Sequence, residues 1–245
     1  MSTTRLLDRV DPGPVLAAQR SRTVNFDARE VDGSWHHDVA RTVLGAEAPG
    51  PPKPNGVWQT ACRLVEAYEF ADKRIIRAVF GVEAPLQGRD MLLEGRFAVL
   101  RFYFGVRVTD VIDEERPRDG DPSTRDRVWG WAYETLEGHL ERGRMSYEVV
   151  KHQDTGTVEL VITAYSEGAP TLGPVTALGW RLFGRRTQLR FYHLCGRRLA
   201  ALVRTHVGQD EPVPQRRVLD GLVLAPSDAG PSGWRGISIR RHQPG

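Results

Sequence analysis

The sequence predicts an α+β fold in which an antiparallel sheet packs on one long C-terminal helix. Two observations lead to this prediction. Between residues 97 and 165, apolar and polar residues alternate in several short runs joined by tight turns, which is typical of an antiparallel meander. From Val175 to Val203 the apolar residues recur in steps of three, four or seven, which is the period of a helix. A helix that follows a meander is expected to cover one face of its sheet.

The first 56 residues are predicted to form an N-terminal extension. Short apolar patches at 15–20 and 39–44 are separated by turn-forming residues, and four prolines follow between Pro49 and Pro54. Proline breaks helices and removes a backbone donor, so we expect an extended linker there. We place the core domain at 57–204. Residues 205–245 are predicted to be a C-terminal tail, broken by prolines, with short strands at 218–224 and 237–239.

The core begins with two segments that are harder to assign. The range 58–70 fits either a strand or a helix. In the range 72–80, Asp72 can cap a helix, and four apolar residues fall on one helical face: Ile75, Ile76, Val79 and Phe80. A glycine at 81 would end it. We therefore expect a short helix at 72–80.

The strands of the meander are predicted at 97–111, 128–136, 145–152 and 157–165. In the first, the even positions from Ala98 to Val108 are apolar and are expected to face the core. A polar, hairpin-like stretch at 113–127 separates it from the second. The last two are joined by Gln153-Asp154-Thr155-Gly156, whose length and composition are typical of a hairpin turn.

The last predicted element is a helix of some seven turns, with a kink near Gly184. Its apolar face holds Leu178, Leu182, Leu189, Tyr192, Cys195, Leu199 and Leu202, and its opposite face holds Arg181, Arg185, Arg186, Arg190, Arg197, Arg198 and Arg204. We expect the arginine face to be solvated. The alternative is an interaction protein that docks acidic partners through this face and the proline-rich arms.

The composition points to an ordinary globular protein. Of 245 residues, 40% are hydrophobic and 27% charged, and 34 basic residues against 31 acidic ones leave a net charge of +3. That small excess does not predict nucleic-acid binding, which needs a basic patch. Neither a signal peptide nor an apolar stretch of ~18 residues is present in the sequence, and Cys62 and Cys195 lie in apolar surroundings. We expect a cytoplasmic protein without stable membrane insertion.

The common nucleotide-binding and hydrolase motifs are absent from the sequence. It holds no P-loop, GxGxxG, GxSxG or HExxH pattern, so we expect no nucleotide-dependent enzyme, serine hydrolase or zincin, and no cofactor. His36-His37-Asp38 resembles a metal motif, but adjacent histidines diverge on a strand or helix and no further spaced ligands follow. We therefore predict no metal site.

One stretch resembles a known family. Residues 130–143 read Gly-Trp-Ala-Tyr-Glu-Thr-Leu-Glu-Gly-His-Leu-Glu-Arg-Gly, and the later Val161 to Ser166 and Gly173-Pro174-Val175 fit the same pattern. The chain over roughly 57–203 resembles the domain of unknown function nineteen-ninety, an uncharacterised family of bacteria and plants, although Glu137 and Leu140 stand where proline is common. Such domains are distantly similar to helix-grip proteins of the START and Bet v 1 type. The resemblance implies a curved sheet closed by the C-terminal helix over an apolar cavity.

The candidate catalytic residues lie in the same stretch. His139 and Glu141 stand between glycines at a predicted strand end, where a carboxylate can orient an imidazole as a general base, with Tyr133 as a further partner. The simpler interpretation is a loop in which these side chains cap exposed backbone groups. The first interpretation predicts a cofactor-independent enzyme of the cyclase, dehydratase or hydrolase type.

The preferred hypothesis is a binding protein for a hydrophobic metabolite or lipid. The predicted pocket, of apolar or mixed polarity, would be lined by Leu100, Phe102, Trp131, Tyr147, Tyr165, Leu178 and Leu182. Arg101 could hold a ligand carboxylate if its strand face lines the pocket; if that face meets solvent, Arg101 is an ordinary surface residue. The sequence does not predict an oligomeric state.

Overall fold

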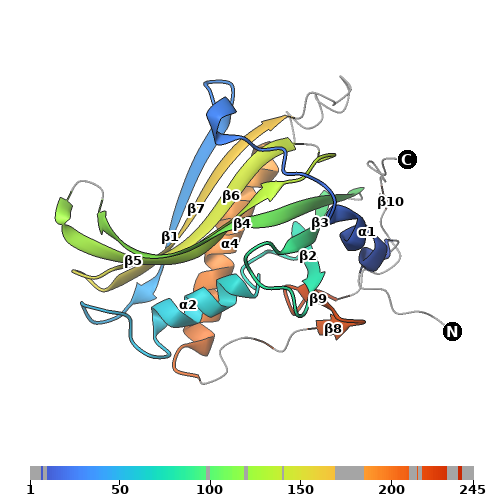
Figure 1. Ribbon diagram of the computed structural model, residues 1–245. Coiled ribbons are helices and arrows are strands. Elements are labelled where there is room, and N and C mark those ends of the chain that lie inside the picture. Colours follow the sequence, from blue (N-terminus) through green and yellow to red (C-terminus); the bar gives the residue numbers. More distant parts are fainter. Residues whose placement is uncertain are drawn as a thin grey trace.

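A computed structural model describes residues 7, 10–97, 100–118, 121–139, 141–168, 185–209, 214, 217–230 and 237–238. Two helices and a short 3-10 turn come before or between the first strands: α1 (Pro12–Gln19), η1 (Ala28–Glu30) and α2 (Val57–Glu66). The long strands are β1 (His36–Ala46), β2 (Ile76–Gly81), β3 (Asp90–Phe97), β4 (Leu100–Arg118), β5 (Asp121–Thr135), β6 (Glu141–His152) and β7 (Thr157–Gly168). The helix α4 (Arg185–His206) and the short strands β8 (Arg217–Leu219), β9 (Leu222–Ala225) and β10 (Ile237–Ser238) complete the described elements (Figure 1).

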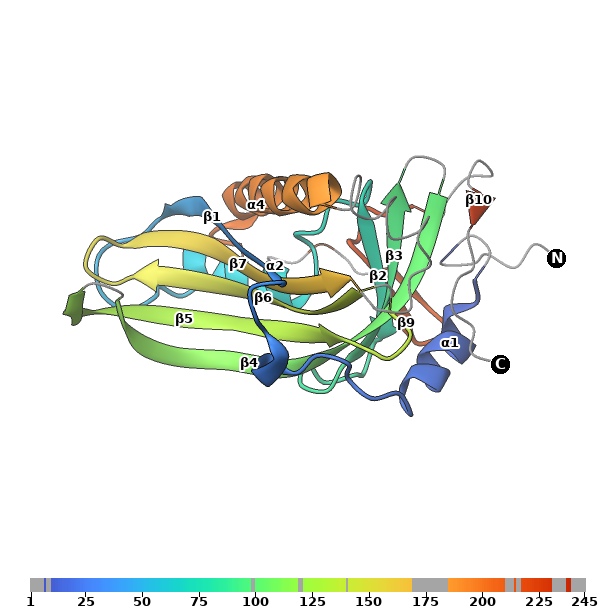
Figure 2. The same ribbon diagram turned by 90° about the horizontal axis from the view of Figure 1, so that it is seen from above.

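One curved antiparallel sheet carries the fold. Its strand order is β1-β7-β6-β5-β4-β3-β2-β9-β8, and β10 adds to β4 in parallel. The consecutive pairing of β4, β5, β6 and β7 confirms the predicted meander. Both α2 and α4 lie on the inner side of the curve (Figures 1 and 2). The predicted fold class, an antiparallel sheet packed on a long C-terminal helix, is therefore confirmed.

The main core lies between the inner face of the sheet and these two helices. On β5 and β6 the inward side chains come from odd positions, including Trp131, Tyr133, Tyr147 and Val149. On α4 the buried residues are Phe191, Tyr192, Cys195, Leu199, Ala200 and Val203. A Cβ atom at Gly196 would collide with Thr42 of β1, so the glycine lets α4 lie directly against that strand.

The helix α4 confirms the predicted period and corrects two residues. Arg198 was expected on the solvated face, but it donates to the Glu69 carbonyl and pairs with Asp228. Tyr192, Cys195 and Leu199 are buried as expected, but Leu189 is 44% exposed. The buried line of the helix passes through Tyr192 and Val203, and Leu189 lies to one side of it because successive residues turn by about 100°. The predicted start at Val175 and the kink at Gly184 lie outside the described residues.

The helix predicted at 72–80 is wrong. Ile75 lies in the turn before β2, and the other apolar residues belong to that strand. Ile76, Ala78 and Phe80 face the main core, and Val79 faces a second one on the other side of the sheet. That second core includes Leu16 of α1 and Leu92 of β3. Because both faces of β2 are covered, its apolar residues are consecutive, and this pattern imitates one face of a helix. The ambiguous range 58–70 contains α2 instead.

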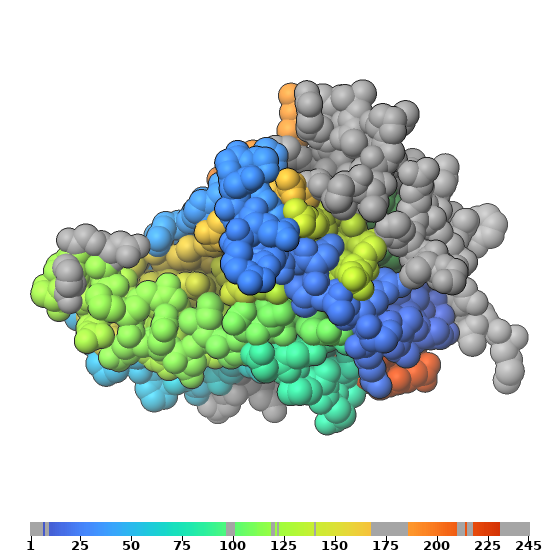
Figure 3. All heavy atoms as spheres, turned by 45° about the horizontal axis from the view of Figure 1, so that its top comes forward, coloured from blue at the N-terminus to red at the C-terminus, as the bar shows by residue number. Residues whose placement is uncertain are grey.

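Segments outside the predicted core domain add to the same sheet. β1 lies before residue 57 and pairs with β7, while β9 lies after residue 204 and pairs with β2. The proline-rich stretch is held by Lys151, whose Nζ contacts Glu47 Oε2 at 2.7 Å and the Pro51 carbonyl at 3.0 Å. In the space-filling view, the segment after α1 (dark blue) lies against the sheet (Figure 3), where Asn25 N–H donates to the Thr135 carbonyl. The boundaries at 57 and 204 stay predictions.

Candidate functional site

Three tyrosine side chains from separate parts of the chain meet in the main core. We call Tyr68, Tyr133 and Tyr147 the tyrosine group; Tyr68 follows α2, and the other two lie on β5 and β6. The ring centroids of Tyr68 and Tyr147 are 6.4 Å apart, and those of Tyr133 and Tyr147 are 6.0 Å apart. All three residues are buried. The group thus brings phenolic hydroxyls into an otherwise apolar interior.

The hydroxyls of Tyr147 and Tyr133 both contact one sulfur atom, Met145 Sδ. Tyr147 donates to Met145 Sδ at 2.9 Å, and Tyr133 lies within 3.5 Å of the same atom. Because Tyr133 stands directly opposite Met145 in the β5–β6 register, strand pairing fixes this arrangement. Cys195 of α4 is fully buried and belongs to the same core cluster as all three tyrosines. The helix therefore closes over the tyrosine group.

Tyr68 is held in an unusual backbone conformation. Its φ is +61°, in the left-handed region that bulky residues rarely adopt, and its side chain has no exposed surface. Such a conformation costs on the order of 1–3 kcal/mol. Within the described part of the chain, its buried hydroxyl makes no hydrogen bond of acceptable distance and angle. The left-handed φ and the unsatisfied hydroxyl both cost stability. The side chain of Tyr68 nevertheless lies wholly in the interior.

The hydroxyls of the tyrosine group stay protonated. Burial raises the pKa of Tyr68 and Tyr147 well above the usual value and raises the pKa of Tyr133 as well, since each phenolate would lose its hydration. The negative charge of Glu141 adds to the rise at Tyr133. Burial likewise raises the pKa of the Cys195 thiol. The interior therefore offers neutral O–H donors rather than anions.

Aromatic rings surround the tyrosine group. Phe70 lies 4.5 Å from Tyr147, measured between ring centroids, and Trp131 lies 5.1 Å from the same ring. The indole N–H of Trp131 donates to the Val65 carbonyl of α2 at 3.2 Å, which satisfies the only polar atom of that side chain. These rings form apolar walls beside a few neutral polar atoms.

His139 and Glu141 meet through the backbone. The Glu141 N–H donates to His139 Nδ1 at 2.9 Å, and the buried ring packs edge-on against Phe104 with centroids 4.6 Å apart. The Glu141 carboxylate accepts hydrogen bonds of 3.0 and 3.2 Å from Gln188 Nε2 of α4. A backbone N–H can only donate, so it uses the Nδ1 lone pair that a general base would need. Tyr133, the predicted third member of this catalytic set, belongs to the tyrosine group.

The remaining predicted ligand-binding residues divide between the two faces of the sheet. Trp131 and Tyr147 face the main core. Phe102 is half-buried and, by strand alternation, lies on the same face of β4 as Val106, which belongs to that core. Leu178 and Leu182 lie outside the described residues, as does the side chain of Leu100.

Tyr165 and Arg101 lie on the outer face. Tyr165 stacks on His37 of β1 with ring centroids 4.5 Å apart, whereas the neighbouring Ala164 faces the core. Arg101 Nε is 3.7 Å from Glu94 Oε1, and Glu94 also binds the buried guanidinium of Arg77. The structure thus separates Tyr165 and Arg101 from the tyrosine group.

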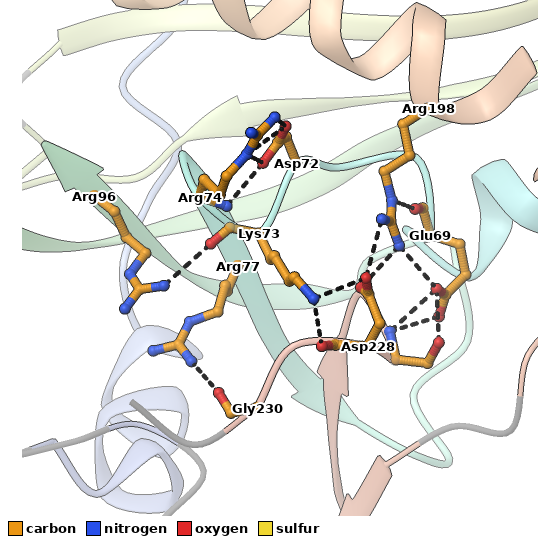
Figure 4. Close-up of polar contacts among 10 residues, drawn as sticks. Glu69, Asp72, Lys73, Arg74, Arg77, Arg96, Arg198, Asp228 and Gly230 are labelled. Atoms are coloured by element: carbon orange, nitrogen blue, oxygen red, sulfur yellow. Dashed lines mark hydrogen bonds and ion pairs between the residues drawn. The ribbon is translucent and has the colours of Figure 1, made fainter. Parts of the chain in front are cut away.

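The residue next to Tyr68 ties the site to the C-terminal segment. The buried Glu69 carboxylate accepts from the Ser227 backbone N–H and hydroxyl at 2.9–3.1 Å. Arg198 of α4 donates to the Glu69 carbonyl at 2.7 Å and to Asp228 at 2.8 Å (Figure 4). Lys73 also reaches Asp228 at 3.0 Å. Tyr68 is therefore braced by α4 and by the segment after β9.

The described residues show neither a metal cluster nor a membrane span. No group of three or more His, Cys, Asp or Glu side chains among them is arranged to hold a metal ion. His36, His37 and Asp38 are successive residues of β1, and the His37 ring stacks on Tyr165. Among the described helices, none is long and apolar enough to cross a bilayer.

Sequence comparison identifies one family. The family model described as "Domain of unknown function (DUF1990)" matches residues 21–198. This range begins upstream of residue 57 and so includes β1. A comparison with curated proteins found no match.

Comparison with solved structures found proteins with low sequence identity. The Zhui aromatase/cyclase from Streptomyces sp. R1128 gives a TM-score of 0.45 at 16% identity, covering 71% of this chain and 97% of that one. Ara h 8.0201 gives 0.37 at 12% identity, with 70% and 99% covered. The ginseng major latex-like protein 151 from Panax ginseng gives 0.38 at 11% identity, with 69% and 97% covered.

Proposed function

The chain belongs to the DUF1990 family, whose description names no activity. From the geometry of the tyrosine group, we propose that the protein binds a small, mainly apolar molecule between the inner face of the sheet and α4. The observation that carries this proposal is the buried Tyr68 hydroxyl, which interacts with the Tyr147 phenol but makes no hydrogen bond of acceptable distance and angle in the described part of the chain. A buried polar group left unsatisfied costs about 1–3 kcal/mol. A bound acceptor would remove that cost.

The chemistry of the tyrosine group indicates the class of ligand. Its hydroxyls are neutral donors, because burial raises the pKa of each phenol. Tyr133 already experiences the negative charge of Glu141, so an anion bound beside it would be repelled. We therefore propose an uncharged ligand with an apolar body and one hydrogen-bond acceptor, such as a ketone, quinone or ester.

Two measurements on the purified full chain test this function. Native mass spectrometry should detect a small molecule that is lost under denaturing conditions. Titration with Nile red, an uncharged dye with a carbonyl acceptor, should give a saturable fluorescence increase, and the anionic dye anilinonaphthalene sulfonate should bind more weakly. Absence of both a retained compound and saturable dye binding would contradict the proposal.

Variants locate the binding. Tyr68→Phe removes the buried hydroxyl that would donate to the ligand, and it should weaken Nile red binding by roughly three- to tenfold, the effect of one hydrogen bond. Tyr165→Phe is the matched control, because Tyr165 lies on the outer face against His37. Equal effects of the two variants would place the dye elsewhere.

The catalytic alternative stays a prediction. An acid–base role for His139 requires a free lone pair aimed at a substrate, and the Glu141 N–H takes the one on Nδ1. The contacts of His139 and Glu141 in the described residues instead join the β5–β6 connection to α4 through Gln188. The binding proposal uses none of these contacts and can be tested separately.

A further inference from the structure

Four arginines form a straight row along the outer side of α4. Arg186, Arg190, Arg197 and Arg204 are all exposed, and we call them the arginine row. At about 100° per residue, positions 4, 11 and 18 after Arg186 lie within about 40° of it around the helix axis. At a rise of about 1.5 Å per residue the row spans about 27 Å. It is therefore a narrow line of positive charge on a rigid element.

The arginine row is not neutralised by its surroundings. The sequence of α4 contains no aspartate or glutamate. Arg198 of the same helix points toward the core and pairs with Asp228 at 2.8 Å (Figure 4). By contrast, none of the four row arginines makes an ion pair in the described part of the chain, whereas many other arginines of the protein do. The positive charge of the row is thus available to a partner.

The row faces away from the sheet. α4 covers the inner side of the sheet, and its own far side has no described element over it (Figure 2). The exposed His193 lies in the same line, and two exposed apolar residues flank it on one side: Leu189, 44% exposed, and Val207, 41% exposed. Both are turned about 60° from the line in the same direction. The outer surface of α4 therefore combines a cationic line with an apolar margin.

We propose that the arginine row docks the protein peripherally on an anionic phospholipid surface. A straight line about 27 Å long on an outer helix can contact a planar array of phosphates along its whole length. The flanking Leu189 and Val207 can lie at the headgroup boundary, as apolar residues do on interfacial helices. Each arginine near such a surface is expected to raise partitioning roughly fivefold.

A single-stranded nucleic acid fits this surface less well. Such binders combine basic residues with exposed aromatic rings on which bases stack. Phe191 and Tyr192 of α4 are both buried against the core, and the one ring exposed in the row is the small imidazole of His193. The apolar margin of Leu189 and Val207 offers no ring for stacking. The row therefore favours lipid phosphates, and nucleic acid serves as an alternative outcome of the test.

Co-sedimentation with lipid vesicles tests the proposal. The full chain should sediment with vesicles of phosphatidylcholine containing one-third phosphatidylglycerol, and not with phosphatidylcholine alone. Raising the salt concentration should release it, since screening shortens the range of these charges. The double variant Arg190→Gln/Arg197→Gln should lower partitioning roughly 25-fold, which is about fivefold for each charge.

A matched variant distinguishes the row from general charge. Arg20→Gln/Arg125→Gln removes the same charge from two exposed positions outside α4 and should leave vesicle binding close to that of the unmodified chain. Thermal unfolding verifies that both double variants are folded. No sedimentation with anionic vesicles at low salt, or equal losses in both variants, would overturn the proposal. Binding to single-stranded or duplex DNA without binding to vesicles would also overturn it.

Discussion

Tyr68 and Tyr147 meet edge-on in the core with their ring centroids 6.4 Å apart and an interplanar angle of 87°. Tyr147 donates its hydroxyl hydrogen to Met145 Sδ, whereas the Tyr68 hydroxyl has no hydrogen bond of acceptable geometry in the described residues. The two phenols are thus neighbours with different requirements. One is already satisfied, and the other has a donor to offer.

This difference predicts opposite effects of Tyr68→Phe on stability and on binding. Removal of an unsatisfied buried hydroxyl should leave the free energy of unfolding unchanged or raise it by about 1 kcal/mol. Nile red affinity should fall roughly three- to tenfold in the same variant. Urea unfolding and dye titration measure the two quantities. A loss of stability without a loss of affinity would show that the Tyr68 hydroxyl supports the fold instead.

Glu69, the next residue, predicts a pH dependence of stability. Its pKa is raised, mainly because the carboxylate is buried, although hydrogen bonds from Ser227 oppose the rise. A carboxyl whose folded-state pKa exceeds its unfolded value contributes stability at low pH and loses it as pH rises through the folded pKa. Glu69→Gln should therefore gain stability relative to the unmodified chain as pH rises from about 4 to about 8. Urea unfolding across this range checks the sign.

Asp72 provides the comparison for that experiment. Its pKa is lowered, chiefly by the hydrogen bond from the Arg74 side chain. The contribution of Asp72 is present above the unfolded pKa and is lost as pH falls. Asp72→Asn should therefore lose stability relative to the unmodified chain as pH rises from about 2 to about 5, a trend of opposite sign to that of Glu69→Gln. The same trend in both variants would contradict the role assigned to burial at Glu69.

The periodicity of the sequence was sufficient to predict the four strands of the meander and the final helix. Odd positions from Trp129 to Tyr133 and from Met145 to Val149 face the core or pack against it, as a period of two requires. The same reasoning failed at β2, because α1 covers the second face of that strand. The local pattern of apolar residues cannot show that a segment distant in the sequence buries the second face of a strand.

The candidate site was predictable only in part. Tyr133, Tyr147 and Trp131 follow from strand alternation, but Tyr165 required the register between strands. Tyr147 stands opposite Ile162, so the inward positions of β7 are even and Tyr165 points outward. Tyr68 could not be predicted, because its left-handed φ arises in a turn after α2 that contains no glycine or asparagine at that position.

The pair formed by Lys151 and Glu47 predicts strong coupling between the sheet and the proline-rich segment. Both side chains are almost fully buried, at 0% and 3% exposure. Lys151→Met leaves the Glu47 carboxylate buried without its cation and should cost roughly 3–5 kcal/mol of unfolding free energy. Lys151→Met/Glu47→Leu should recover most of that loss. Urea unfolding of the two variants provides the measurement, and equal stability of both would contradict the coupling.

The contact between Gly196 and Thr42 predicts that a better helix former will destabilise the protein. Alanine raises helix propensity by about 1 kcal/mol over glycine. At position 196, however, its Cβ would overlap Thr42 and push α4 away from β1. Overpacking of this kind costs typically 1–3 kcal/mol, so Gly196→Ala should lower the free energy of unfolding overall. Because α4 closes over the tyrosine group, the same variant should weaken Nile red binding.

Ala201→Gly is the control on the exposed side of the helix. It should cost about 1 kcal/mol of unfolding free energy through helix propensity alone and leave dye affinity unchanged. A gain in stability for Gly196→Ala would show that α4 does not lie as close to β1 as the structure places it.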